Sequence, residues 1–289
     1  MKKQRKAYLY ALATVLLWST VASAVKISLR HINVIPLLFF ASITSTVTFF
    51  ACLLFFGKLN MLKILSKKDY LQSALLGFLN PFLYYVILFK AYSLLPAQQA
   101  QPINFLWPIT LVLLSVPLLK QKIRPRDILA VIVSFAGVFI ISTRGNVSEF
   151  KSVNLTGVLL ALSSTVIWAL FWIYNIKDRR DEAIRLFLNF AFGSGFTLLA
   201  MLLFAETKVP NAKGVLGAVY IGLFEMGITF LLWLKALKIS STTAYVANLI
   251  YLTPFLSLVV ISIIVGEKIL LSTVIGLAFI VSGIILQKL

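Results

Sequence analysis

The sequence predicts an all-α integral membrane protein with ten transmembrane helices, arranged as two inverted five-helix repeats. Composition is the first reason: 60% of the 289 residues are hydrophobic and only 12% are charged, whereas soluble domains are near half apolar and a quarter charged. Segment length is the second, because apolar runs recur at about the 20 residues that a helix needs to cross a bilayer core. The third is that features of the first half recur in the same order in the second half.

The apolar runs follow one another through short polar connections that leave no room for a soluble domain. The first run follows the basic start Lys2-Lys3-Gln4-Arg5-Lys6, which resembles a signal peptide. No convincing cleavage site follows, so we expect a first transmembrane helix with a basic anchor. The expected helices cover residues 8–28, 34–56, 70–92, 97–119, 126–143, 155–176, 184–205, 213–235, 242–265 and 271–288.

The net charge of +18 would suit a nucleic-acid partner if the basic residues formed one soluble face. They lie instead in the short gaps between apolar runs. With ten spans, most of the 27 Lys and Arg residues fall on the same side as both termini. Because basic loops favour the cytoplasm, we expect a multi-pass protein of the inner (plasma) membrane with both termini cytoplasmic and no nucleic-acid partner. Residues 177–182 are expected to be a solvated run of charges.

No pattern in the sequence predicts catalysis, a cofactor or a metal ion. The one cysteine, Cys52, lies in an apolar run, and the one histidine, His31, lies in a short loop. There is no P-loop, no metal-binding histidine motif and no pair of carboxylates. We therefore expect no enzyme, no metal and no cofactor, and any active transport has to be secondary because no ATP-binding motif is present.

The two halves match at nearly constant offsets. Trp18 corresponds to Trp168 at an offset of 150 residues, and Pro108 corresponds to Pro254 at an offset of 146 residues. Five helices is an odd number, so the second copy enters the membrane with the opposite orientation. Inverted repeats of this kind are the architecture of many secondary transporters. The repeats are expected to cover residues 1–145 and 146–289.

Glu225 is the most informative single residue, because it lies near the middle of the eighth apolar run. A carboxylate there costs a few kcal/mol on insertion scales, and intramembrane ionisable groups are functional by default. Glu225 is expected to bind a proton or a substrate ammonium group; the alternative is a structural hydrogen bond to a neighbouring helix. Its counterpart at an offset of 145 residues is Asn80, which either lines the same site or makes an interhelical hydrogen bond.

Prolines predict interruptions in the third, fourth and ninth helices, at Pro81, Pro108 and Pro254. Paired interruptions in corresponding segments indicate a transporter binding site. Aromatic and amide side chains near these breaks are further candidates for substrate binding, although core packing is an alternative for each of them. They are Trp18, Tyr84, Asn104, Trp107, Trp168, Asn248 and Tyr251.

Three stretches resemble the EamA family of the drug/metabolite transporter superfamily. They are "ILFKAYSLLPAQQAQPINFLWPIT", "WLKALKISSTTAYVANLIYLTPFLS" and "GEKILLSTVIGLAFIVSGIIL". The resemblance implies two EamA-like repeats, a central cavity, and export or exchange of amino acids and related metabolites. The run "NFLWP" is also similar to the aromatic amino acid exporter branch, which would suit a cavity lined by Tyr84, Tyr85 and Trp107. One departure is that the first repeat has Lys120-Gln121-Lys122 where the second has Gly266-Glu267-Lys268, so an acidic gating residue would be kept only in the second half.

Together these observations favour a secondary transporter that works by alternating access and exports small metabolites, above all amino acids or related compounds. Protons are a candidate coupling ion, membrane lipids surround the chain, and a homodimer is left open. Alternatives are a lipid flippase, an integral-membrane enzyme acting on lipid-linked substrates, and a passive channel. The enzyme would need a polar catalytic cluster, and saturable counterflow would separate a carrier from a channel.

Overall fold

The computed structural model describes residues 2–120, 122–146, 148, 152–204, 211–240, 246 and 248–288, and over these residues the chain is helical without strands. Eight helices in the described part are long and apolar enough to cross a membrane. Two shorter apolar helices follow, at Leu249–Val265 and Leu271–Gln287. The expected all-α, multi-pass membrane fold is therefore confirmed, while the count of ten spans stays a prediction.

The first half of the chain contains five long helical segments, of which the third and fourth are each built from shorter pieces. Helices α3, η2 and α4 form one segment over Lys67–Leu94, and α5 and α6 form another over Ala97–Leu119. The elements are α1 (Lys2–Ser28), α2 (Val34–Phe55), η1 (Leu59–Ile64), α3 (Lys67–Gly77), η2 (Phe78–Leu83), α4 (Tyr84–Leu94), α5 (Ala97–Asn104), α6 (Trp107–Leu119) and α7 (Pro125–Ser142).

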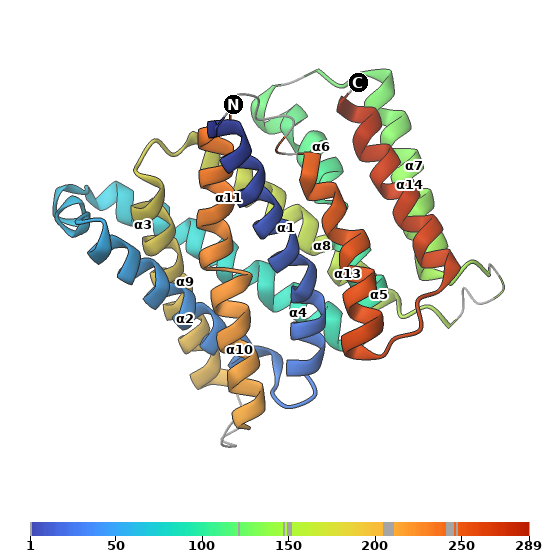
Figure 1. Cartoon of the computed structure of the whole chain (residues 1–289), viewed down its shortest axis with the longest axis horizontal. Helices are drawn as coiled ribbons and strands as arrows, with labels where there is room; N and C mark the ends of the chain where they lie inside the picture. The colour runs from blue at the N-terminus through green and yellow to red at the C-terminus, as the bar shows by residue number, and fades with distance from the viewer. Residues whose placement is uncertain are drawn as a thin grey trace.

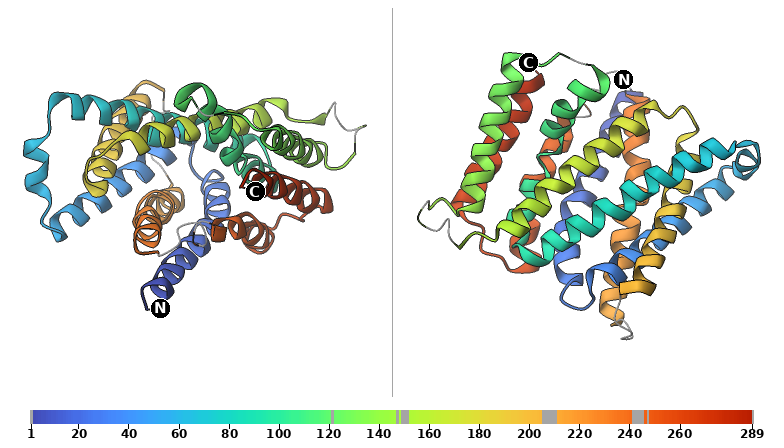
Figure 2. Two further views of the ribbon diagram at one scale, coloured as in Figure 1. Left: turned by 90° about the horizontal axis from the view of Figure 1, so that it is seen from above. Right: turned by 180° about the vertical axis from the view of Figure 1, so that it is seen from behind.

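The second half repeats this order, and its eighth and ninth segments are again interrupted. Helices α10 and α11 together cover Ala212–Ile239. The elements are α8 (Leu155–Lys177), α9 (Glu182–Phe204), α10 (Ala212–Phe224), α11 (Ile228–Ile239), η4 (Leu249–Leu252), α13 (Thr253–Val260), η5 (Ile261–Val265) and α14 (Leu271–Lys288). Figure 1 and Figure 2 show the two termini at the same end of the molecule.

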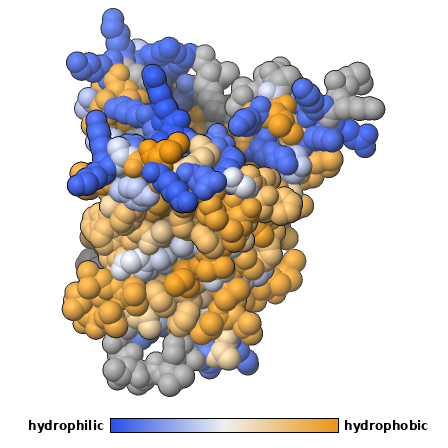
Figure 3. Space-filling model, turned by 90° about the vertical axis from the view of Figure 1, so that its left-hand side faces the viewer, coloured by the Kyte–Doolittle hydropathy of each residue, from blue (hydrophilic) through white to orange (hydrophobic). Residues whose placement is uncertain are grey.

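The outer surface has the polarity that a bilayer requires. On the face shown in Figure 3, hydrophobic side chains form a band between hydrophilic ends. Large apolar side chains are exposed on several helices, for example Val47 at 61% and Ile263 at 74%. Soluble monomers rarely expose contiguous apolar surface of this extent, whereas lipid tails cover it without cost.

Helices α7 and α14 lie side by side at one edge of the molecule (Figure 1), and glycines bring their backbones close together. A Cβ atom added to Gly137 would lie 2.4 Å from the carbonyl oxygen of Gly276, and one added to Gly276 would lie 2.6 Å from that of Gly137. On Gly283 it would lie 2.7 Å from the carbonyl of Ala130. Small residues permit this approach between membrane helices.

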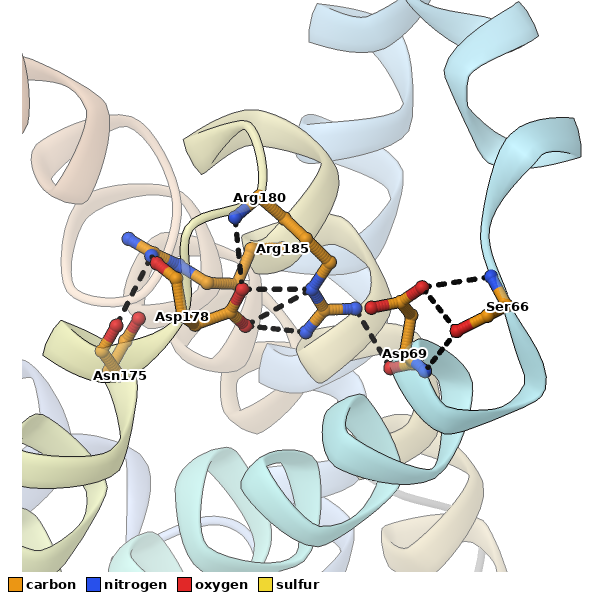
Figure 4. Close-up of polar contacts among 6 residues, drawn as sticks. All are labelled: Ser66, Asp69, Asn175, Asp178, Arg180 and Arg185. Carbon is orange, nitrogen blue, oxygen red and sulfur yellow. Dashed lines mark hydrogen bonds and ion pairs between the residues drawn. The ribbon is translucent and has the colours of Figure 1, made fainter.

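A buried charge cluster ties the loop between α8 and α9 to the start of α3 (Figure 4). The Arg180 guanidinium donates to both carboxylate oxygens of Asp178, with Nε–Oδ1 at 2.9 Å and Nη2–Oδ2 at 2.5 Å. Its Nη1 also donates to the backbone carbonyl of Asp69 at 2.8 Å. The Asp178 side chain is only 2% exposed. The expectation of a solvated charge run is therefore wrong for this pair, because the fold of the loop against α3 buries it.

The same contacts set the ionisation of Asp178. Burial alone would raise the pKa of this carboxyl, but hydrogen bonds from the Arg180 side chain and backbone outweigh burial. They stabilise the charged form and hold the pKa below its usual range. Asp178 therefore stays ionised at neutral pH as one half of a buried ion pair.

Candidate functional site

A cavity of about 390 Å³ lies between helices of both halves, within the size range of small-molecule sites. Its walls come from α1, α4, α5 and α6 of the first half, and from α8, α11, η4, α13 and α14 of the second half. Of the 25 described residues that line the cavity, 11 are aromatic. The aromatic residues are Trp18, Tyr84, Tyr85, Phe89, Tyr92, Phe105, Trp107, Trp168, Trp172, Trp233 and Tyr251.

Glu225 reaches this cavity from the break between α10 and α11. The Tyr85 hydroxyl donates to its Oε1 at 3.0 Å. The indole Nε1 of Trp18 donates to its backbone carbonyl at 3.2 Å. No cationic side chain in the described part of the chain forms an ion pair with this carboxylate. A carboxyl group with one neutral donor thus faces an apolar chamber at mid-span.

The break that presents Glu225 is supported by its neighbours. The hydroxyl of Thr229 donates to the carbonyl of Phe224, and that of Ser45 donates to the carbonyl of Gly222 at 2.6 Å. These donors satisfy carbonyls that lose their helical partners. Gly227 occupies the turn because a Cβ there would lie 2.7 Å from the Gly222 carbonyl oxygen. The interruption is therefore a packed feature with its own hydrogen bonds.

Corresponding interruptions occur in the other segments with predicted breaks. Asn80 leaves helical geometry with φ −149° and ψ 119°, directly before Pro81 in η2. Pro108 lies in the first turn of α6, and Pro254 lies in the first turn of α13. The chain leaves helical geometry before Pro81, whereas at Pro108 and Pro254 the backbone stays in the right-handed helical region and one helical piece passes into the next.

A hydrogen-bonded chain connects α4 to α8 across α5. The Tyr84 hydroxyl donates to Asn104 Oδ1 at 3.3 Å, and Asn104 Nδ2 donates to Ser164 Oγ at 2.9 Å. The Tyr84 ring lies with its centroid 4.6 Å from those of both Tyr85 and Trp168. Tyr84 and Asn104 are therefore fixed in the wall beside Glu225.

Of the sequence-predicted site residues, seven line the cavity: Glu225, Tyr84, Asn104, Trp107, Trp18, Trp168 and Tyr251. Asn80 does not. It is fully buried in η2, and neither atom of its amide has a hydrogen-bond partner. Asn248 is exposed and also lies outside the cavity wall. Of the prolines, Pro108 lines the cavity.

The predicted set omits lining residues such as Trp233 and Gln287, whereas Tyr85, which the family resemblance placed in the cavity wall, does line it. Trp233 lies in α11, beyond the break at Gly227, so helical spacing from Glu225 does not indicate it. Tyr85 corresponds to Phe230 by the repeat offset of Asn80 and Glu225. Nothing in its local sequence distinguishes it from Tyr84 as the donor to Glu225.

At the end of the cavity near Tyr92, polar contacts join α1 to α4 within the first half and α5 to the second half. Lys26 Nζ donates to the carbonyls of Tyr92 at 2.8 Å and Leu95 at 2.6 Å. Glu267 accepts from the backbone N–H groups of Ala97 at 2.8 Å and Gln98 at 3.0 Å, so its charge lies at the N-terminus of α5.

The Gln98 side chain completes this connection. Its Nε2 donates to the carbonyl of Lys268 at 2.9 Å, and its Oε1 accepts from the N–H of Leu270 at 3.0 Å and the hydroxyl of Thr273 at 3.1 Å. We refer to Lys26, Gln98 and Glu267 as the clasp. Gln121, the residue that corresponds to Glu267 in the first half, lies outside the described residues.

Comparison with known proteins gives one family and several relatives. The model of the EamA-like transporter family matches residues 5–143 and 155–287. An uncharacterized transporter of Clostridium kluyveri is 32% identical over 59% of this chain and 56% of its own length. The uncharacterized transporter YvbV of Bacillus subtilis is 30% identical over 75% of this chain and 70% of its length.

Two further matches are a relative with a named function and a solved structure. The aromatic amino acid exporter YddG of Ancylobacter novellus is 27% identical over 53% of each chain. The chain thus spans about half the length of the Clostridium and Ancylobacter relatives. One solved crystal structure has 22% sequence identity, a TM-score of 0.68 and 98% coverage of both chains, which shows that the fold is shared.

Proposed function

Since this chain belongs to the EamA-like transporter family, we propose that it is a secondary carrier that moves small metabolites by alternating access. Amino acids or related compounds are the proposed substrates, and export is the proposed direction. The chain would lie in the inner membrane with ten spans and both termini cytoplasmic. Residues 1–145 and 146–289 would be the two inverted repeats, with Glu225 binding a proton or an amine.

One observation carries this proposal: the interrupted segments of both halves meet at one cavity with a single carboxylate. Its wall includes Asn104 and Trp107 from the fourth segment, Glu225 from the eighth and Tyr251 from the ninth. Binding sites of secondary transporters form at such breaks near the bilayer midplane. A structural role alone would not explain an accessible carboxylate in an aromatic chamber.

The clasp supports the alternating-access part of the proposal. It closes the end of the cavity that lies beside Tyr92, where Lys26 and Glu267 join α1 and the α13–α14 connection to the ends of α4 and α5. For the cavity to face the opposite side, these contacts must break while others form near the termini. The two halves would rock about the cavity between these arrangements.

The substrate proposal rests on the cavity wall and on one relative. YddG of Ancylobacter novellus is named an aromatic amino acid exporter, and eleven aromatic residues line the cavity of this chain. Aromatic rings in the wall favour ligands with a flat apolar part through stacking and area burial. Aromatic amino acids and compounds derived from them are therefore the first substrates to test.

The proposal is tested with the purified chain in proteoliposomes. A thermal-shift screen of amino acids and their amines identifies ligands, because a ligand of the native state raises apparent stability. Vesicles loaded with an unlabelled ligand are then placed in labelled ligand. A carrier gives saturable uptake that the internal ligand accelerates. Uptake without this acceleration would indicate a channel, and absence of uptake for every ligand would reject a carrier of these metabolites.

Glu225→Gln tests the role of the carboxylate in transport. We expect at least a tenfold loss of counterflow, because the amide cannot bind a proton or form an ion pair. The matched control is Glu182→Gln, which changes a carboxylate in the first turn of α9. Equal rates and equal pH dependence for wild type and Glu225→Gln would remove Glu225 from the mechanism.

A further inference from the structure

The polar groups of the cavity narrow the class of substrate, on the premise that the cavity is the transport site proposed above. We infer that the ligand is a monovalent arylalkyl amine without a carboxylate. Its ammonium group would bind Glu225, and its ring would stack among Tyr84, Trp168 and Trp172. This narrows the broader class of amino acids and related compounds to its decarboxylated members.

The first step concerns charge. Glu225 faces the cavity with one neutral hydrogen bond, from Tyr85. The described residues that line the cavity include no Lys, Arg or His. A carboxylate in such surroundings needs a proton or a cation because isolated burial of the charge is costly. The protein supplies no counter-charge there, so a cationic ligand would complete the pair.

The second step concerns the rings beside the carboxylate. Trp18 donates to the backbone carbonyl of Glu225, which holds its indole against the same residue. Tyr85 donates to the carboxylate itself, and its ring centroid lies 4.6 Å from that of Tyr84. Aromatic faces attract an ammonium group through their quadrupoles, more strongly when the site is desolvated. The Glu225 carboxylate and the aromatic rings thus both favour a positively charged group on the ligand.

The third step concerns the carboxylate group that an amino acid substrate would carry in addition to its ammonium group. A substrate carboxylate is held in many transporters by the N–H groups of a half-helix N-terminus. Here α6 and α13 begin beside the cavity, but Pro108 and Pro254 in their first turns each remove one N–H. The N–H of Thr253 is already bonded to the carbonyl of Ile250. An amino acid carboxylate would therefore lie in the same chamber as the Glu225 carboxylate, without a cationic side chain among the described lining residues and with fewer free N–H groups at these two helix starts.

The fourth step uses the remaining polar atoms of the wall. Gln101 Oε1 and Thr253 Oγ1 are buried, line the cavity and have no partner. Trp172 Nε1 and Gln287 Nε2 also line the cavity and are buried without a hydrogen-bond partner, and both are neutral donors. Unmade hydrogen bonds of buried groups are costly, so a ligand that completes them gains affinity. A hydroxyl group on the ring suits these four neutral atoms, because it can both donate and accept.

The inference is tested by equilibrium binding to the full chain in lipid nanodiscs, followed through tryptophan fluorescence. The probes are tyramine, phenethylamine, tyrosine and 3-(4-hydroxyphenyl)propionate. We expect tyramine to bind at least tenfold more tightly than tyrosine, phenethylamine to lie between them, and the propionate not to bind. Glu225→Gln should weaken tyramine at least tenfold, whereas Glu182→Gln should leave it unchanged. Elution of each variant as a single monodisperse peak checks folding.

Two results would overturn the inference: tyrosine binding as tightly as tyramine, or tyramine binding that Glu225→Gln leaves intact. Counterflow measurements distinguish a failure of the amine inference from a failure of the carrier proposal. Exchange of tyrosine but not of tyramine would keep the carrier and reject the amine. Glu225-dependent binding of tyramine without counterflow of any probe would keep the ligand class and reject the carrier.

Discussion

At the scale of single residues, two neighbouring tyrosines have different roles that follow from their partners. Tyr85 donates to the carboxylate of Glu225, whereas Tyr84 donates to the neutral amide oxygen of Asn104. Hydrogen bonds to charged groups contribute about 1.5–3 kcal/mol, and those between neutral groups about 0.5–1.5 kcal/mol. The pair therefore offers an internal comparison within one turn of α4.

We predict that Tyr85→Phe lowers the free energy of unfolding by about 2 kcal/mol and Tyr84→Phe by about 1 kcal/mol. Both variants keep the ring and its stacking, so the difference isolates the hydroxyl. Chemical denaturation in detergent measures both. Equal losses would mean that the Glu225 carboxyl is neutral in the ligand-free protein.

Asp178 gives a prediction with a definite pH dependence. Its pKa is lowered in the folded protein, so its contribution is present above the unfolded pKa of about 3.9 and is lost as the pH falls through the folded value. Asp178→Asn should cost about 3 kcal/mol at pH 7, because it leaves Arg180 buried without a counter-charge. The difference from wild type should shrink below about pH 4.

The control for this prediction is the more exposed ion pair of the same loop. Lys58 and Asp181 are 34% and 26% exposed and lie 2.6 Å apart. Lys58→Met should cost less than about 1 kcal/mol, as exposed pairs do. Denaturation across a pH series compares the variants. A cost for Asp178→Asn that stays constant down to pH 3 would show that packing, not charge, is lost.

At the scale of elements, the contact between α7 and α14 depends on the absence of side chains. A Cβ on Gly276 would lie 2.5 Å from Ile141 and 2.6 Å from the carbonyl oxygen of Gly137. We predict that Gly276→Ala costs about 1–3 kcal/mol through overpacking. Gly195→Ala in α9 is the matched control, because its Cβ would meet nothing within 4 Å. Thermal unfolding of both variants tests this, and equal midpoints would refute close packing at Gly276.

The sequence predicts the helical elements well because each is specified locally. Apolar length alone marks the segments, and Pro81 and Pro108 lie where the third and fourth segments are interrupted. Glu225 lies at a break for which the sequence offers no proline. Its charge therefore indicated a functional residue but not the interruption of the helix.

What could not be predicted depends on how elements dock. Trp233 and Gln287 line the cavity because of helix rotation and packing, which no local pattern encodes. The contact of Glu267 with Ala97 spans 170 residues of sequence. Asp178 was expected to be solvated because a run of charged residues does not show which of them a neighbouring helix will bury.

At the scale of the whole molecule, we propose that the clasp governs which side of the cavity is closed. Glu267 contributes a charge at the N-terminus of α5 and two charge-assisted hydrogen bonds. Removing the charge should shift the population toward an arrangement with this end open. The effect is global, because Glu267 and Gln98 join α5 of the first half to the connection before α14 in the second half.

We predict that Glu267→Gln raises, by several-fold, the rate at which a membrane-impermeant thiol reagent labels Val25→Cys. Val25 lines the cavity and is fully buried. Cys52 is first replaced by serine, so that the new thiol is the one labelled. Labelling is followed from the side opposite the termini. An unchanged rate in Glu267→Gln, with Glu182→Gln as the control, would show that the carboxylate does not hold this end closed.

Lys26 and Glu267 of the clasp bind backbone atoms, which affects how the ligand preference of such a protein can change in evolution. Lys26 binds the carbonyls of Tyr92 and Leu95, and Glu267 binds the N–H groups of Ala97 and Gln98. Every one of these partners is backbone, so substitution of Tyr92 changes the cavity wall without deleting a contact of the gate. On the proposed function, the Tyr92 side chain would contribute to ligand selectivity while its backbone carbonyl would hold the gate. Descendants of this chain would then acquire new ligands by substitution at Tyr92 while inheriting the same contact.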